Sequence, residues 1–190
     1  MKNNLRFAFF IVTAFFCVTL VFPFSASAQR RDHLTEMETE LVREMQEIDK
    51  RTEIYVKAID RRFLVLNKDS SQSKKVEKDL DKWGELPVGT RTQLLLDIEK
   101  ILQEAIDNID NVAEHDMKSV LLPKAVRVLA DASNRFLPQL KTFLDSAQND
   151  KEKGAMIGAI DYCNQIIEAS AKLPKEEKEK GKRKKAKSKK

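Results

Sequence analysis

The sequence has few of the residues that break helices or cross-link chains. Its 190 residues include only five glycines, five prolines, two cysteines, two histidines and one tryptophan. So few cysteines exclude a disulfide-stapled scaffold, and so little glycine and proline excludes a collagen-like chain. No stretch alternates polar and apolar residues as a half-buried strand does. The chain is long enough to bury one hydrophobic core, so we expect one helical domain.

Charge is distributed very unevenly along the chain. The whole sequence has 35 basic and 30 acidic residues, a formal net charge of +5. Residues 175–190 contain ten bases and three acids, a net charge of +7, and residues 1–28 contain two bases and no acid. The remaining 23 bases and 27 acids give residues 29–174 a net charge of −4. Each of the three segments is therefore interpreted separately.

The first segment has the three parts of a secretory signal peptide. A short basic start is followed by an apolar run over 7–22 and by the small residues Ala26-Ser27-Ala28. This pattern predicts export and cleavage between Ala28 and Gln29. The absence of an Asn-x-Ser/Thr sequon fits bacterial export, to the periplasm or the medium.

An alternative is that residues 7–24 remain as a membrane anchor, since they approach the length that spans a bilayer. Pro23 and the small residues before the cleavage site favour removal. Cleavage would leave Cys163 as the only cysteine, and no internal disulfide could then form. Cys163 continues an apolar stripe with Ile160 and Ile167, which predicts a small buried residue; an intermolecular disulfide or a reactive thiol is the alternative.

Apolar residues recur at steps of three and four along most of residues 29–174, the spacing of one helix face. Four long amphipathic helices are predicted, at about 33–66, 91–115, 122–147 and 152–172. Capping boxes mark two of the starts, at Thr35 with Glu38 and at Thr90 with Gln93. The first helix would be about 50 Å long at 1.5 Å per residue, so we expect a bend or an overhang. Pro138 should kink or break the third helix.

Four such helices with mostly short connections predict an all-α fold, an antiparallel bundle. A short additional helix over Val76, Leu80 and Trp83, stopped by Gly84, should cover one end of it. Residues 175–190 have almost no apolar side chain and predict a disordered tail. The predicted organisation is a signal peptide at 1–28, a bundle domain at 29–174 and a Lys-rich tail at 175–190.

The sequence contains no recognisable catalytic or cofactor motif. A bundle with two metal ions needs Glu-x-x-His on each of two helices, but Val112 stands three residues before His115. His33 shares a helix face with Glu36 alone, which is too few ligands for a metal centre. We therefore predict no bound metal, no cofactor and no enzymatic activity.

Two patterns on the predicted helices are interpreted as structural. Asp107, Asp110 and Glu114 form an acidic stripe, and we expect a solvated helix face rather than an acid–base pair. Gly154 and Gly158 stand four residues apart, and we expect close packing against a neighbouring soluble helix rather than a dimer in a membrane.

The basic tail and the single tryptophan are the candidates for binding. Tail residues are predicted to contact polyanions through release of counterions. These residues are Lys182, Arg183, Lys184, Lys185, Lys187, Lys189 and Lys190. The polyanions open to an exported protein are membrane lipid phosphates, envelope polymers and extracellular nucleic acid; a solvated tail with no dedicated partner is the alternative. Trp83 could anchor a protein partner or plug the end of the bundle, and we favour the plug.

These features predict a non-enzymatic, exported helical binding or interaction protein whose tail contacts an anionic surface or polymer. One alternative is a ligand or cofactor carrier, or an enzyme, with its site inside the bundle near Trp83. Another is a helical chaperone for exported proteins. The oligomeric state and the identity of a protein partner are open at this point.

Overall fold

The computed structural model describes residues 31–67, 80–116 and 118–174. The chain divides into two compact units, Met1–Asp32 and His33–Lys190. Only Arg31 and Asp32 of the first unit are described, so the fold below is that of the second. The predicted signal peptide, its cleavage site, Val76 and the basic tail lie outside the described residues.

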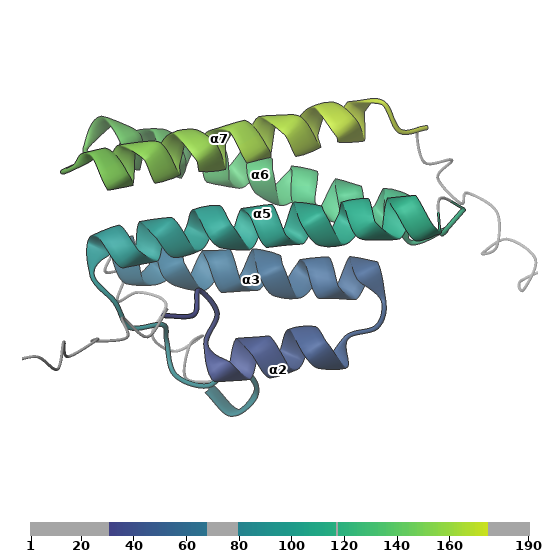
Figure 1. Cartoon of the computed structure of the whole chain (residues 1–190), viewed down its shortest axis with the longest axis horizontal. Coiled ribbons are helices and arrows are strands. Elements are labelled where there is room, and N and C mark those ends of the chain that lie inside the picture. The colour runs from purple at the N-terminus through teal and green to yellow at the C-terminus, as the bar shows by residue number, and fades with distance from the viewer. Residues whose placement is uncertain (1–30, 68–79, 117, 175–190) are drawn as a thin grey trace, which may run out of the picture. The chain divides into compact units, whose positions relative to one another are not determined.

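Every regular element of the described residues is helical, which confirms the all-α prediction. The helices labelled in Figure 1 are α2 (Glu36–Glu44), α3 (Ile48–Asn67), α5 (Arg91–His115), α6 (Leu122–Asp145) and α7 (Asp150–Ala171). A further helical turn spans residues 80–83. The last three long helices begin and end within two residues of the predicted bounds. Side chains cap the starts of α5 and α7, and a proline stands in the first turn of α6.

The prediction of one continuous helix over 33–66 is wrong. α2 and α3 are separate helices and the chain reverses between them, since Glu38 of α2 lies against Arg62 of α3. In the connection Met45 has an extended backbone (φ −81°, ψ 111°), and its carbonyl accepts a hydrogen bond from Arg51 Nε at 2.8 Å. The connecting residues are all good helix formers, so the reversal has a tertiary cause.

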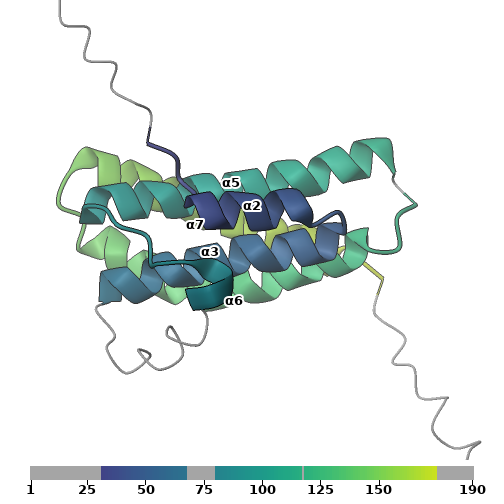
Figure 2. The same ribbon diagram turned by 90° about the horizontal axis from the view of Figure 1, so that it is seen from below.

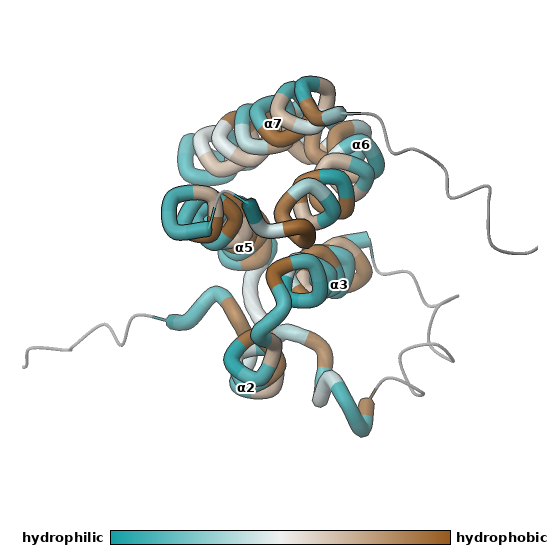
Figure 3. The backbone as a smooth tube through the Cα atoms, turned by 90° about the vertical axis from the view of Figure 1, so that its right-hand side faces the viewer, coloured by the Kyte–Doolittle hydropathy of each residue, from teal (hydrophilic) through white to brown (hydrophobic). Residues whose placement is uncertain are grey.

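The four long helices pack around one core in the order α3, α5, α7, α6, as the end-on view in Figure 3 shows. α5 and α6 are consecutive in sequence but lie on a diagonal and touch little. α3 and α6 start at one end, where Lys124 pairs with Asp49, and α5 and α7 start at the other, where Arg91 pairs with Glu152. Each long helix therefore has one parallel and one antiparallel neighbour. α2 lies outside these four helices, along α3 (Figure 2).

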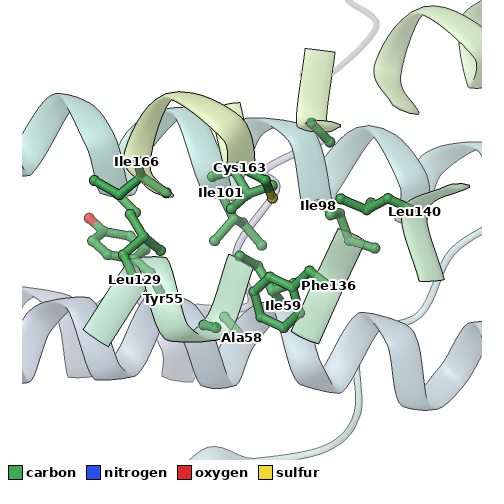
Figure 4. Packing of buried hydrophobic residues seen from close by; sticks show 14 of the residues in the cluster. Tyr55, Ala58, Ile59, Ile98, Ile101, Leu129, Phe136, Leu140, Cys163 and Ile166 are labelled. Carbon is green, nitrogen blue, oxygen red and sulfur yellow. The ribbon is translucent and has the colours of Figure 1, made fainter. Parts of the chain in front are cut away.

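The apolar stripes of the four helices meet in a single core (Figure 4). Phe63 of α3 packs in this core against two rings of α6: its ring centroid lies 5.4 Å from that of Phe136 and 6.0 Å from that of Phe143, a range in which aromatic rings attract. Cys163 is fully buried in this core, which confirms the prediction for it. Burial raises the pKa of the Cys163 thiol to about 11, so the thiol stays protonated.

Two predicted helix breakers behave differently. α6 continues through Pro138 to Asp145, so the proline does not end the helix. The Thr142 hydroxyl donates to the Pro138 carbonyl at 3.0 Å. Gly84 does stop its helical turn: its φ is +64°, and its N–H donates to the Leu80 carbonyl at 2.8 Å. Glycine suits that left-handed conformation because it has no Cβ.

The two glycines of α7 lie in different environments. A Cβ on Gly158 would come within 2.7 Å of the Glu99 carboxylate of α5, whereas a Cβ on Gly154 would meet no atom within 4 Å. The prediction of close helix packing is therefore confirmed for Gly158 and wrong for Gly154. Burial against α7 raises the pKa of Glu99 above its usual range.

Among the described helices, none is long and apolar enough to cross a membrane.

Candidate functional site

A buried cluster of charges joins α2 to α3. The Glu38 carboxylate is fully buried and accepts a hydrogen bond from Arg62 Nη1 at 2.6 Å, with Arg61 Nε at 3.1 Å. Arg62 is 1% exposed and also donates to the carbonyls of Ala58 (2.8 Å) and His33 (2.7 Å). A buried charge is costly unless it is paired and hydrogen-bonded, so these side chains depend on one another.

The capping box of α2 holds Glu38 in place for this role. Thr35 Oγ1 accepts from the Glu38 N–H at 3.3 Å, and the second carboxylate oxygen of Glu38 accepts from the Thr35 N–H at 2.9 Å. Both predicted capping boxes are present. Arg61 also donates to the carbonyls of Gly84 and Glu85, so it holds the chain after Trp83 against α3. One cluster therefore links three segments that are distant in sequence.

Trp83 belongs to a small apolar cluster beside these charges. It packs with Leu41 of α2 and Ile54 of α3, and each of the three is 7–8% exposed. The Arg61 guanidinium lies 5.7 Å from the centroid of the tryptophan ring, close enough for a cation–π contact. Trp83 does not close an end of the bundle as predicted, because it packs against α2 and α3 in a cluster apart from the main core. Its role as a partner anchor stays a prediction, and 8% exposure leaves little of the ring for a partner in this conformation.

A chain of hydrogen bonds runs from the segment before α2 across α5 and α3. His33 Nε2 lies 2.5 Å from one Glu104 oxygen, and the Tyr55 hydroxyl donates to the other at 2.8 Å. Asn108 Nδ2 donates to the Tyr55 oxygen at 3.2 Å, and Arg51 Nη1 donates to Asn108 Oδ1 at 3.1 Å. Since Arg51 also binds the α2–α3 connection, the chain fixes both ends of α2.

These hydrogen bonds bring His33, Glu104 and Tyr55 together. A histidine, a carboxylate and a tyrosine within hydrogen-bond reach can transfer protons in an enzyme. Here the His33 hydrogen bond holds the pKa of Glu104 below its usual range, with burial opposing it and the Tyr55 hydroxyl adding to it. Burial, followed by the Glu104 contact, raises the pKa of Tyr55 well above its usual range, so the phenol keeps its proton. Among the described residues no three His, Cys, Asp or Glu side chains gather to hold a metal ion.

A second buried acid joins the starts of α5 and α7. Glu152 is fully buried and accepts hydrogen bonds from Thr92 Oγ1 at 2.6 Å, the Gln148 N–H at 3.0 Å and Arg91 Nε at 3.2 Å. Burial alone would raise the pKa of Glu152, but these three donors lower it below its usual range. This cluster fixes the α6–α7 turn on α5.

The acidic stripe on α5 is solvated, as predicted. Asp107, Asp110 and Glu114 are all exposed. Partial burial raises the pKa of Asp110, and repulsion by Asp107 and then by Glu114 adds to the effect. His115 lies nearby, and its Nδ1 is 2.8 Å from the Asn111 carbonyl. The stripe is an exposed acidic surface in the second half of α5.

The described chain ends where the basic tail begins. α7 ends at Ala171, Leu173 packs against the core, and Arg127 Nη2 donates to the Pro174 carbonyl at 2.5 Å. Pro174, the last described residue, is thus held against α6. The seven residues predicted to contact polyanions lie outside the described part of the chain: Lys182, Arg183, Lys184, Lys185, Lys187, Lys189 and Lys190.

Sequence reasoning identified Glu38 as a capping residue but missed its ion pair with Arg61 and Arg62. The signal was present, because two consecutive arginines stand between Ile59 and Phe63 on the apolar face of a helix. Charges at such positions need a buried partner.

This chain matches no protein-family model, no curated protein and no solved structure. A functional proposal consequently rests on the residues themselves.

Proposed function

We propose that this protein is an exported, non-enzymatic tethering protein, a four-helix bundle whose cationic tail binds an anionic surface. The observation that carries the proposal is the separation of charge along the chain. Residues 175–190 have a net charge of +7, and residues 29–174 have a net charge of −4. A basic domain would bind polyanions over its folded surface. Here the helical domain is net acidic, so only the basic tail would bind them.

The tail has enough charge to act as a tether. Each Lys or Arg near an anionic membrane contributes about 1 kcal/mol, so a net charge of +7 gives roughly 7 kcal/mol, a dissociation constant of about 10 μM. Most of this binding comes from released counterions and is weakened by salt. The same chemistry applies to lipid phosphates and to phosphate-rich envelope polymers.

The attachment of the tail supports this function. The Arg127 hydrogen bond to Pro174 and the packing of Leu173 hold the last described turn against the helical unit. As the flexible chain that its composition predicts, the tail would span about 20 Å. A mildly acidic body is repelled by an anionic surface, so the tail would bind while the body stays in solution.

Binding of the mature chain, beginning at Gln29, to defined polyanions tests the proposal. The probes are phosphatidylglycerol vesicles, phosphatidylcholine vesicles, a soluble poly(glycerol phosphate) and single-stranded DNA. We expect binding to phosphatidylglycerol and no measurable binding to phosphatidylcholine, since only the first is anionic. Tighter binding to the polymer than to the vesicles would identify an envelope polymer as the surface; tighter binding to DNA would identify nucleic acid.

Three tail variants sharpen the test. Deletion of 175–190 and replacement of its seven distal basic residues by glutamine should each abolish binding. Glu176→Gln with Glu177→Gln and Glu179→Gln removes the three acids instead, and should strengthen binding. If the deletion leaves binding unchanged, the tail is not the tether.

Export is tested independently of binding. The chain recovered from the periplasm or medium should begin at Gln29 on N-terminal sequencing. A chain that keeps Met1 and stays in the membrane would show that residues 7–24 are an anchor. In that case the surface would be bound by the leader, and the tail would need another role.

A further inference from the structure

The connection between α2 and α3 contains no residue that breaks a helix. Only Met45, Gln46 and Glu47 separate the two helices, and all three residue types favour helix. Neither glycine nor proline occurs anywhere from residue 29 to residue 67. The backbone leaves the helical conformation at Met45 and re-enters it at Ile48. The turn therefore forms because α2 packs back on α3, and not because its own residues demand a turn.

The apolar stripe also continues through this connection. Met37, Leu41, Met45, Ile48 and Thr52 follow one another at steps of four, four, three and four. Those steps place all five on one face of a helix that would run without interruption. One sequence thus supports two conformations, a hairpin of two helices and a single long helix.

α2 takes its support from the rest of the molecule. It has nine residues, fewer than the roughly 12–15 that an isolated helix needs in water. Its buried residues are Glu38, which pairs with Arg62, and Leu41, which packs with Ile54 and Trp83. Each of these contacts joins α2 to a residue beyond the connection, so each could be made with a second copy of the chain.

We propose that α2 is an arm that two copies of this chain exchange. In the exchanged dimer α2 and α3 form one continuous helix, and the α2 of each copy occupies the α2 position of the other. Glu38 of one copy pairs with Arg62 of the second, and the reciprocal pair forms by two-fold symmetry. The contacts of α2 are those of the monomer. In the connection, helical hydrogen bonds replace the bond from Arg51 to the Met45 carbonyl. This inference does not depend on the proposed tether, although a dimer would carry two tails.

The connection offers a substitution that separates the two forms. Met45 already has the extended backbone that proline requires of the residue before it, so Gln46→Pro fits the hairpin. The same proline would stand inside the continuous helix and break it. Gln46→Ala is the matched control, because alanine suits both forms. The mature full-length chain is incubated near the onset of unfolding, cooled, and analysed by size-exclusion chromatography with light scattering over a range of concentrations.

We expect both the wild-type chain and Gln46→Ala to form a larger fraction of dimer as the protein concentration rises. Gln46→Pro should lower the association constant by at least about a hundredfold, since each dimer contains two broken helices. A wild-type chain that stays monomeric at every concentration would overturn the proposal. So would a Gln46→Pro chain that dimerises as well as the wild type.

A disulfide distinguishes arm exchange from an ordinary dimer. Leu41→Cys with Ile54→Cys joins α2 to α3 where the two side chains share a cluster. When isolated dimer is oxidised, exchange predicts a covalent dimer on a non-reducing gel. Asn67→Cys with Gln139→Cys is the control. The exposed side chain of Asn67 in α3 donates a hydrogen bond at 3.0 Å to that of Gln139 in α6. Neither helix is exchanged, so this disulfide should form within one chain in both the monomer and the dimer. A Leu41–Ile54 disulfide that also stays within one chain would exclude exchange.

Discussion

Glu38 and Arg62 form an ion pair that is closed to solvent on both sides. The carboxylate and guanidinium lie 2.6 Å apart, and the side chains are 0% and 1% exposed. The two residues are 24 positions apart in sequence, on two helices that the apolar spacing predicts to be one. This pair explains why α2 folds back, because neither charge can be buried without the other.

Removing the charge of Glu38 should be strongly destabilising. Glu38→Gln keeps a side chain able to complete the capping box but leaves two arginines without their buried counter-charge. We expect a loss of about 3–5 kcal/mol in the free energy of unfolding, measured with urea. Glu40→Gln, which breaks an exposed pair with Arg43, should cost less than about 1 kcal/mol. Equal effects of the two substitutions would contradict the role given to the buried pair.

Stability should fall in acid, partly because of Glu104. The His33 contact lowers the pKa of Glu104 in the folded protein, with burial opposing and Tyr55 assisting. A lowered pKa adds stability above the ordinary carboxyl pKa, and this is lost as pH falls through the folded value. Glu104→Gln should therefore flatten the dependence of the unfolding free energy on pH below about pH 5.

Asp110→Asn provides a comparison of opposite sign. Burial and the neighbouring acids raise the pKa of Asp110, so its ionised form destabilises the fold. The substitution should increase stability at neutral pH, and the gain should vanish in acid as the native carboxyl takes up its proton. Urea unfolding across the same pH series measures both variants. Parallel curves for Glu104→Gln and the wild type would contradict the account of Glu104.

Two glycine substitutions should have effects of opposite sign. Gly84→Ala places a Cβ at φ +64° and within 2.8 Å of Met37 Cγ, and should cost about 1–2 kcal/mol. Gly154→Ala adds a Cβ that meets no atom within 4 Å, at a position in the interior of α7. It should stabilise the protein by about 0.5–1 kcal/mol, because alanine favours the helix more than glycine does. Thermal unfolding of both variants checks the signs. A stabilising Gly84→Ala would mean that the turn after Trp83 tolerates another conformation.

Cys163 should react with thiol reagents only when the fold opens. Its side chain is fully buried, and burial raises its pKa to about 11. At neutral pH the native thiol is both inaccessible and protonated, so labelling should be slow and should accelerate with urea. Rapid labelling of the native chain would show that α6 and α7 separate easily.

Local signals explain which parts of the fold were predictable. Thr90 with Gln93 marks the start of α5, and Thr35 with Glu38 marks the start of α2. These caps and the apolar spacing depend on neighbours within one or two turns, so sequence patterns identify them. The order of the helices around the core depends instead on Asp49 meeting Lys124 and Arg91 meeting Glu152. No pattern of sequence spacing predicts a pairing between residues so far apart in the chain.

The same distinction applies to the candidate sites. Composition alone identifies a cationic tail, because charge and the lack of apolar residues are local properties. The pairing of Glu38 with Arg61 and Arg62 could not be predicted from the apolar stripe, which assigned the neighbours of these residues to one long helix. Trp83 was recognised as important, but its position against Leu41 depends on that same reversal.

The dependence of binding on salt tests the central proposal most directly. The association constant of the mature chain for phosphatidylglycerol vesicles is measured over a series of salt concentrations, with and without residues 175–190. Tethering by the tail predicts that log K falls steeply and linearly with log salt for the full chain, and that the truncated chain shows no measurable binding. Equal slopes and equal affinities for the two chains would contradict it.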